Sequence, residues 1–193
     1  MLHDSDKKQF KITRIAGICG IFIPVVIFTC LGLSITSSPW FTWTEHALSD
    51  LGIQKNTAAV FNNGLILGGI LTLIFSLGLL KILSNKTGAY FFICSSLALI
   101  GIGVFPETIF TLHFLTSASF FIFLTIALLI IGITTKNNSY ERRFGTVALV
   151  FASIAICSSV FLFHFEGIAI SEAFSCFPAF IWCSIVGIHM THR

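Results

Sequence analysis

Histidine and carboxylate side chains, the residue types that most often carry acid–base or metal chemistry, share three short stretches of this chain. Five of the eight Asp and Glu residues lie in these stretches, and each stretch also holds one histidine. The stretches are Glu45, His46 and Asp50; Glu107 and His113; and His164, Glu166 and Glu172. Because long apolar segments separate them, we expect any chemistry of the protein to lie where these three stretches meet.

The composition is that of an integral membrane protein. Of the 193 residues, 55% are hydrophobic and only 10% are charged. A mean hydropathy of +0.96 is too high for a water-soluble fold. The net charge of +3 comes from basic residues spread over the ends of the apolar segments rather than clustered in a patch. We therefore expect membrane lipids as partners and no nucleic acid.

Six apolar runs predict membrane spans, since about 18 or more apolar residues are needed to cross a hydrocarbon core. The sixth run is slightly shorter, and none of the six contains Asp, Glu, Lys, Arg or His. The runs cover residues 15–36, 59–80, 87–104, 114–133, 144–163 and 173–188. The sequence therefore predicts an all-α fold, with a single six-helix transmembrane domain over residues 15–193 that follows an N-terminal segment of residues 1–14.

The distribution of the basic residues predicts how the bundle is oriented in the cell membrane. If the N-terminus is cytoplasmic, all Lys and Arg residues except Lys55 lie on the cytoplasmic side. This is a strong positive-inside bias. We therefore expect both termini in the cytoplasm and the three His and carboxylate stretches on the extracytoplasmic face.

The first stretch predicts a short interfacial helix over residues 43–51. Thr42 begins a Thr-x-x-Glu capping box, and Gly52 is a suitable helix stop. In such a helix His46 and Asp50 are four residues apart and share a face. An amphipathic turn that rests on the bilayer with solvated charges is an equally good interpretation.

The other two stretches allow structural explanations beside functional ones. His113 borders an apolar run, where an ionisable side chain needs a partner, and a structural hydrogen bond is its more frequent explanation. Ser171 is the expected N-cap of the sixth helix, with Glu172 favoured in the first turn by the helix dipole. That interpretation leaves His164 and Glu166 unexplained.

Together the three stretches predict one site with the ligand types of a catalytic divalent metal such as zinc. The candidate metal ligands are His46, His113 and His164. The candidate catalytic carboxylates are Asp50, Glu107 and Glu166. Neither HxxxH nor HExxH spacing is present, so the ligands would have to converge from separate segments. A proton-handling site is the alternative.

Three strings of the chain resemble domain-of-unknown-function family 998: WFTWTEHALSDLG (residues 40–52), FNNGLILGG (residues 61–69) and GVFPE (residues 103–107). The likeness in the number and layout of spans covers nearly the whole chain. The family contains prokaryotic six-span membrane proteins, so the resemblance implies the fold and no reaction. No string of the third stretch, residues 164–172, matches. A distant similarity to membrane proteins of lipid metabolism points toward lipid substrates.

Two classes of function fit these features, and a third does not. A metal-dependent hydrolase or lipid-modifying enzyme would use the His and carboxylate cluster, with Asp50 or Glu107 as general base. A non-enzymatic scaffold or lipid-binding accessory protein needs only the bundle and is the alternative. A transporter needs charges or broken helices at mid-membrane, and the apolar runs offer no charge there.

Overall fold

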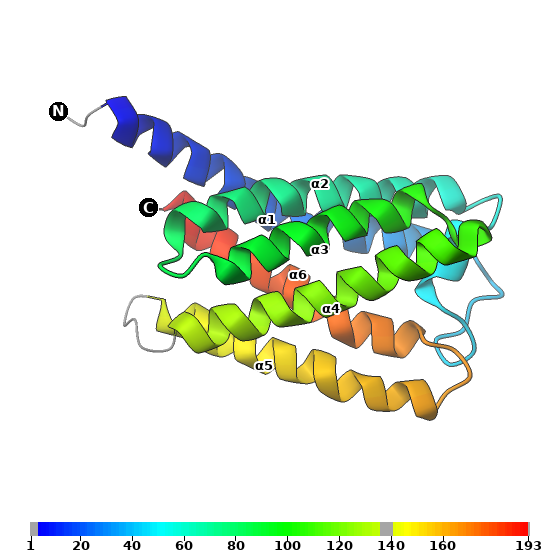
Figure 1. The fold of residues 1–193 in the computed structure, drawn as a ribbon. Helices are drawn as coiled ribbons and strands as arrows, with labels where there is room; N and C mark the ends of the chain where they lie inside the picture. Colours follow the sequence, from blue (N-terminus) through cyan, green and yellow to red (C-terminus); the bar gives the residue numbers. More distant parts are fainter. Residues whose placement is uncertain (1–3, 136–140, 193) are drawn as a thin grey trace.

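The computed structural model describes residues 4–135 and 141–192, and within these ranges the regular structure is entirely helical (Figure 1). Six long helices are joined by short segments, three of which contain 3-10 helices. The long helices are α1 (Asp4–Thr36), α2 (Ala58–Ile82), α3 (Thr87–Val104), α4 (Phe110–Thr135), α5 (Arg142–Ser158) and α6 (Ala169–Thr191). The 3-10 helices are η1 (Leu48–Gly52), η2 (Glu107–Ile109) and η3 (Ser159–Phe163).

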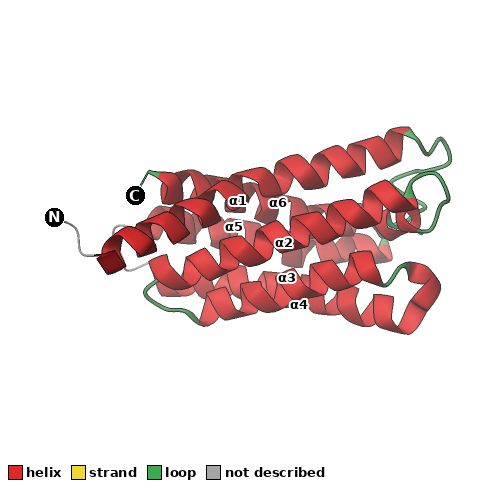
Figure 2. Ribbon diagram, turned by 90° about the horizontal axis from the view of Figure 1, so that it is seen from above, coloured by secondary structure: helices red, strands yellow, loops and turns green. Residues whose placement is uncertain are grey.

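All six predicted spans are confirmed as helices that are long and apolar enough to cross a membrane. The protein is therefore a multi-pass membrane protein. Helix α3 has the predicted bounds, and α2 differs from its prediction by one or two residues at each end. Helix α1 begins at Asp4, well before the predicted span, and its first turns extend beyond the rest of the bundle (Figures 1 and 2).

The helices form a closed ring in chain order, in which each packs on its sequence neighbours and α1 packs on α6. Helix α6 also contacts α4 and α2, and so lies nearest the middle of the bundle. Its Trp182 is buried, with ring centroids 5.7 Å from Phe92 and 6.1 Å from Phe75. The indole N–H of Trp182 donates to the carbonyl of Phe144 at 3.0 Å, which satisfies its polar atom in the core.

Glycines allow the closest helix contacts, as expected for small residues in membrane bundles. A Cβ atom on Gly64 or Gly68 of α2 would collide with Cys30 or Ile27 of α1, respectively. This Gly-x-x-x-Gly pair therefore lets α2 pack closely against α1.

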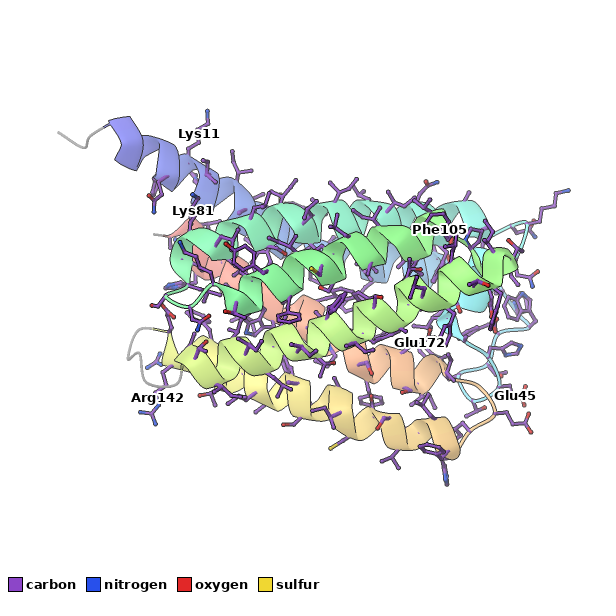
Figure 3. The ribbon with its side chains drawn as sticks, viewed as in Figure 1. Lys11, Glu45, Lys81, Phe105, Arg142 and Glu172 are labelled. Carbon is purple, nitrogen blue, oxygen red and sulfur yellow. The ribbon has the colours of Figure 1, made fainter. Side chains whose placement is uncertain are left out.

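The two ends of the bundle differ in charge (Figure 3). Lys11, Lys81 and Arg142 lie at one end, which we call the basic end, whereas Glu45 and Glu172 lie at the other. The second end, which we call the carboxylate end, is formed by the α1–α2, α3–α4 and α5–α6 connections. Lys136 and Arg193, which contribute to the predicted charge bias, lie outside the described residues.

A short helix is present in the α1–α2 connection, but the predicted bounds, residues 43–51, are wrong. Residues 43–45 form a turn, and only the 3-10 helix η1 follows. The carbonyls of Thr44 and His46 accept hydrogen bonds from Gly167 (2.8 Å) and Ala169 (2.9 Å) instead of closing helical turns. Since residues 43–47 are not helical, His46 and Asp50 do not share a helix face.

Candidate functional site

The α1–α2 connection covers the carboxylate end of the bundle. Leu48 and Leu51 of η1 are buried in a small apolar cluster with residues of α1, α2 and α6. Two side chains of α2 or its N-cap hold the end of η1 in place: Thr57 Oγ1 donates to the carbonyl of Leu51 at 2.7 Å, and Asn62 Nδ2 donates to that of Gly52 at 2.8 Å. The connection is therefore a packed cap.

The α5–α6 connection docks directly on this cap. Besides the two backbone hydrogen bonds from Gly167 and Ala169, the Leu48 N–H donates to Glu172 Oε2 at 2.6 Å. Gly167 has no room for a side chain, because a Cβ there would collide with the backbone of Glu45 and His46. Two segments more than a hundred residues apart in sequence thus form one unit.

Three carboxyl groups come together at the cap: Asp50 from the α1–α2 connection, Glu107 from the α3–α4 connection and Glu172 from the first turn of α6. The carboxyl groups of Asp50 and Glu107 lie within hydrogen-bonding reach of each other, and a hydrogen bond between them needs a proton on one of the two. Glu172 lies close enough to interact electrostatically with both. The Asp50 Oδ2 atom also accepts from the Ala47 N–H at 2.9 Å, so its orientation is fixed by the start of η1.

Glu107 is the least satisfied member of this carboxyl cluster, which we define as Asp50, Glu107 and Glu172. Its Oε2 atom is buried, and no N–H or O–H donor of the described residues reaches it. A buried acceptor without a donor costs about 1–3 kcal/mol. A proton shared with Asp50, a water molecule or a donor group on a bound molecule would satisfy this oxygen.

His113 is the histidine associated with the carboxyl cluster. It is buried, with 8% of its surface exposed, and it lies near enough to Glu107 for electrostatic attraction. Its Nδ1 is 2.8 Å from the carbonyl oxygen of Phe105, so Nδ1 carries the proton and donates. Its Nε2 lies 3.4 Å from Ser117 Oγ. The structural hydrogen bond that the sequence favours is present, and it fixes the orientation of the His113 ring.

His46 and His164 occupy other environments. The His46 ring packs edge-on against Trp40 at 4.9 Å, and its Nδ1 accepts from the Thr42 N–H at 3.2 Å. His164 is exposed beside Phe165.

The three histidines therefore do not fit the predicted metal centre. Across residues 4–135 and 141–192, no group of three or more His, Cys, Asp or Glu side chains is placed to hold a metal ion. The ligand set His46, His113 and His164 gains no support from the fold, and we derive no chemical step through a metal. The predicted carboxylates divide: Asp50 and Glu107 are paired, whereas Glu166 is exposed to solvent.

Glu172 is the member of the cluster that the sequence interpretation treated as structural. The predicted N-cap at Ser171 is wrong, because α6 begins at Ala169 and Ile168 is the residue that precedes it. Glu172 instead points inward and bonds the cap. The signal was available: Glu172, Cys176 and Cys183 are spaced by 4 and 7 residues, and this spacing follows the buried face of α6.

Two hollows meet at Glu172. A small cavity of about 60 Å³ lies under the cap, with a lining that includes Leu48, Ser117 and Cys176. A larger groove of about 420 Å³ lies between α4, α5 and α6. Phe121 and Glu172 line both, so they form the wall between the cavity and the groove.

A family of proteins of unknown function, DUF998, matches residues 18–189 of the chain. This match covers all six membrane helices apart from the ends of α1 and α6. No curated protein and no solved structure matches the chain. What the carboxyl cluster does must therefore be inferred from its own geometry.

Proposed function

The chain belongs to the DUF998 family of proteins of unknown function, and we propose that it is a membrane enzyme that modifies lipids by acid–base catalysis at its carboxyl cluster. The observation that carries the proposal is the contact between Asp50 and Glu107. Two carboxyl groups that share one proton offer a general base and a general acid side by side.

Hydrolysis of a lipid ester illustrates how the pair would work. The ionised carboxyl group takes a proton from water as the water oxygen bonds to the ester carbonyl carbon. The protonated carboxyl group gives its proton to the alcohol oxygen as the carbon–oxygen bond breaks. The products are a fatty acid and an alcohol, and the proton has moved from one carboxyl group to the other, as aspartic dyads allow.

Glu172 and His113 act as positioning residues in this proposal. Glu172 holds the cap over the pair through the Leu48 N–H. His113, fixed by the Phe105 carbonyl, interacts favourably with ionised Glu107. Neither role involves binding of a metal ion.

A lipid is the proposed substrate because of where the pair lies. The cluster sits at one end of a bundle of membrane-spanning helices, and its Glu172 lines a small cavity whose lining is mainly apolar. The positive-inside rule would place the carboxylate end on the extracytoplasmic side of the cell membrane, since Lys55 is the one described Lys or Arg of the connections at that end.

Purified protein in liposomes of mixed ester lipids would test the proposal, with lipid products measured by mass spectrometry. We expect Asp50→Asn and Glu107→Gln to lower turnover by at least about 100-fold each, the lower range for loss of a general acid or base. Glu45→Gln is the matched control, because Glu45 is an exposed carboxylate on the same cap. Its turnover should equal that of the parent.

The non-enzymatic alternative makes a different prediction in the same experiment. A scaffold or lipid-binding accessory protein would retain bound lipid through purification and convert none of the ester lipids offered. Lipid retained without any product, or equal turnover in the parent and in Asp50→Asn, would contradict the enzymatic proposal.

A further inference from the structure

The groove between α4, α5 and α6 opens sideways, within the membrane-spanning part of the protein. Its lining includes Phe121, Ile122, Thr125 and Ile126 of α4 and Ser171, Glu172 and Ser175 of α6, all inside helices long and apolar enough to span a membrane. Figure 1 shows α4 and α5 diverging toward the carboxylate end, with α6 between them. Ile122, Leu162 and Ile168 line the groove and are exposed. In a membrane the medium beside them is lipid.

The groove has the size and lining of a ligand site. Its volume of about 420 Å³ falls in the range of roughly 300–1,000 Å³ that is typical of small-molecule sites. Ile122, Ile126 and Leu162 provide apolar surface, whereas Ser159, Ser171, Ser175 and Glu172 add polar groups. A molecule with an acyl chain and a polar end would match this division.

The polar end of the groove leads to the carboxyl cluster, because Glu172 lines the groove and also interacts with Asp50 and Glu107. No Lys or Arg of the described residues is among the charges that act on Glu107 or Glu172. A phosphate placed beside three carboxyl groups would be repelled. Hydroxyl or amine groups would instead donate hydrogen bonds to a carboxyl oxygen, and Glu172 is the member of the cluster that lines the groove.

We propose that the groove is the lateral access route and chain-binding site for one membrane lipid, whose headgroup carries hydroxyl or amine donors and no phosphate. The inference rests on the proposed function, because it names the substrate class and its route to the same carboxyl pair. The lipid leaves the bilayer between α4 and α5, its chain lies along Ile122 and Ile126, and its headgroup reaches Glu172.

Photolabelling would test the groove independently of catalysis. The probe is a monoacylglycerol with a diazirine in its acyl chain, added to the protein in nanodiscs, irradiated and mapped by peptide mass spectrometry. We expect labels concentrated on the groove residues of α4, η3 and α6. Thr125→Trp should fill the groove and abolish that labelling, and Ser159→Trp provides a second variant on the opposite wall.

Val150→Trp is the matched control, since Val150 is an exposed residue of α5 that does not line the groove. Its labelling should equal that of the parent. Labels spread evenly around the bundle, or unchanged groove labelling in both Thr125→Trp and Ser159→Trp, would overturn the proposed site.

Competition experiments test the headgroup. Unlabelled monoacylglycerol and a long-chain amine should displace the probe, and the stronger competitor identifies the preferred donor. Phosphatidic acid should compete at least about tenfold less well, because like charges placed together cost several kcal/mol. Equal competition by phosphatidic acid would overturn the headgroup assignment.

The experiments distinguish failure of the enzymatic function from failure of the lipid-binding groove. Asp50→Asn should keep the groove labelling while losing turnover. Labelling confined to the groove in a parent protein that converts no lipid would leave the binding site standing and refute the enzymatic function. Turnover accompanied by labels outside the groove would support the enzymatic function and refute the proposed binding site.

Discussion

Gly167 is the point at which docking of the α5–α6 connection on the cap can be tested with one methyl group. In Gly167→Ala the new Cβ would collide with the backbone of Glu45 and His46, which no side-chain rotation can relieve. The connection must move away, and the hydrogen bonds from Gly167 and Ala169 to the cap lengthen or break. The carboxyl cluster would lose the contact that fixes Glu172 beneath Leu48.

The size of the effect follows from these contacts. Overpacking costs about 1–3 kcal/mol, and each of two backbone hydrogen bonds contributes about 0.5–1.5 kcal/mol. The docked arrangement should therefore be weakened by at least about 2 kcal/mol. Since every 1.4 kcal/mol is a factor of ten, cap opening should become about 30-fold more frequent.

Hydrogen–deuterium exchange of the Leu48 and Ala169 amides measures this opening. Both amides donate across the docked interface, and both should exchange about 30-fold faster in Gly167→Ala than in the parent. Gly32→Ala is the matched control, because a Cβ on Gly32 meets nothing within 4 Å. Unchanged exchange of both amides in Gly167→Ala would refute tight docking of the two connections.

Two further predictions concern the same end of the molecule. Glu172→Ala should lower stability by about 1–3 kcal/mol, measured by thermal unfolding in detergent, because it leaves a buried N–H without its acceptor; the exposed Glu166, changed to Ala as a control, should leave unfolding and turnover unchanged. In a cysteine-free background, an impermeant thiol reagent applied to intact cells should label a cysteine at Gln54 but not one at Lys86, and the reverse labelling would overturn the proposed orientation.

The spans could be predicted because the bilayer imposes a length and a composition that are visible in sequence. Helix α3 has the predicted bounds, since Lys86 precedes it and a Phe-Pro pair follows it. Hydropathy, however, indicates which residues lie in the membrane and does not indicate where a helix begins. Helix α1 therefore continues through charged residues to Asp4, which an apolar run could not indicate.

The cap was mispredicted because its structure is set by partners distant in sequence. Thr42 Oγ1 donates to Glu45 Oε2 at 3.2 Å, but this contact joins two side chains and does not cap backbone N–H groups, and residues 43–47 are not helical. The backbone of Gly167 and Ala169 binds the carbonyls that helical turns would need. Local propensity cannot reveal this competition, because the competing groups lie in another connection.

The candidate site was predicted better by its carboxylates than by its histidines, for a physical reason. A histidine at a membrane boundary can satisfy itself locally, and His46 and His113 do so with Thr42 and Phe105. Two carboxyl groups in contact have no such local solution, because both are acceptors unless one holds a proton. The pairing of Asp50 with Glu107 is therefore harder to explain as structure alone, and the same holds for the buried Glu107 oxygen that no donor of the described residues satisfies. A donor brought by a substrate would satisfy that oxygen, as the proposed acid–base chemistry at this pair requires.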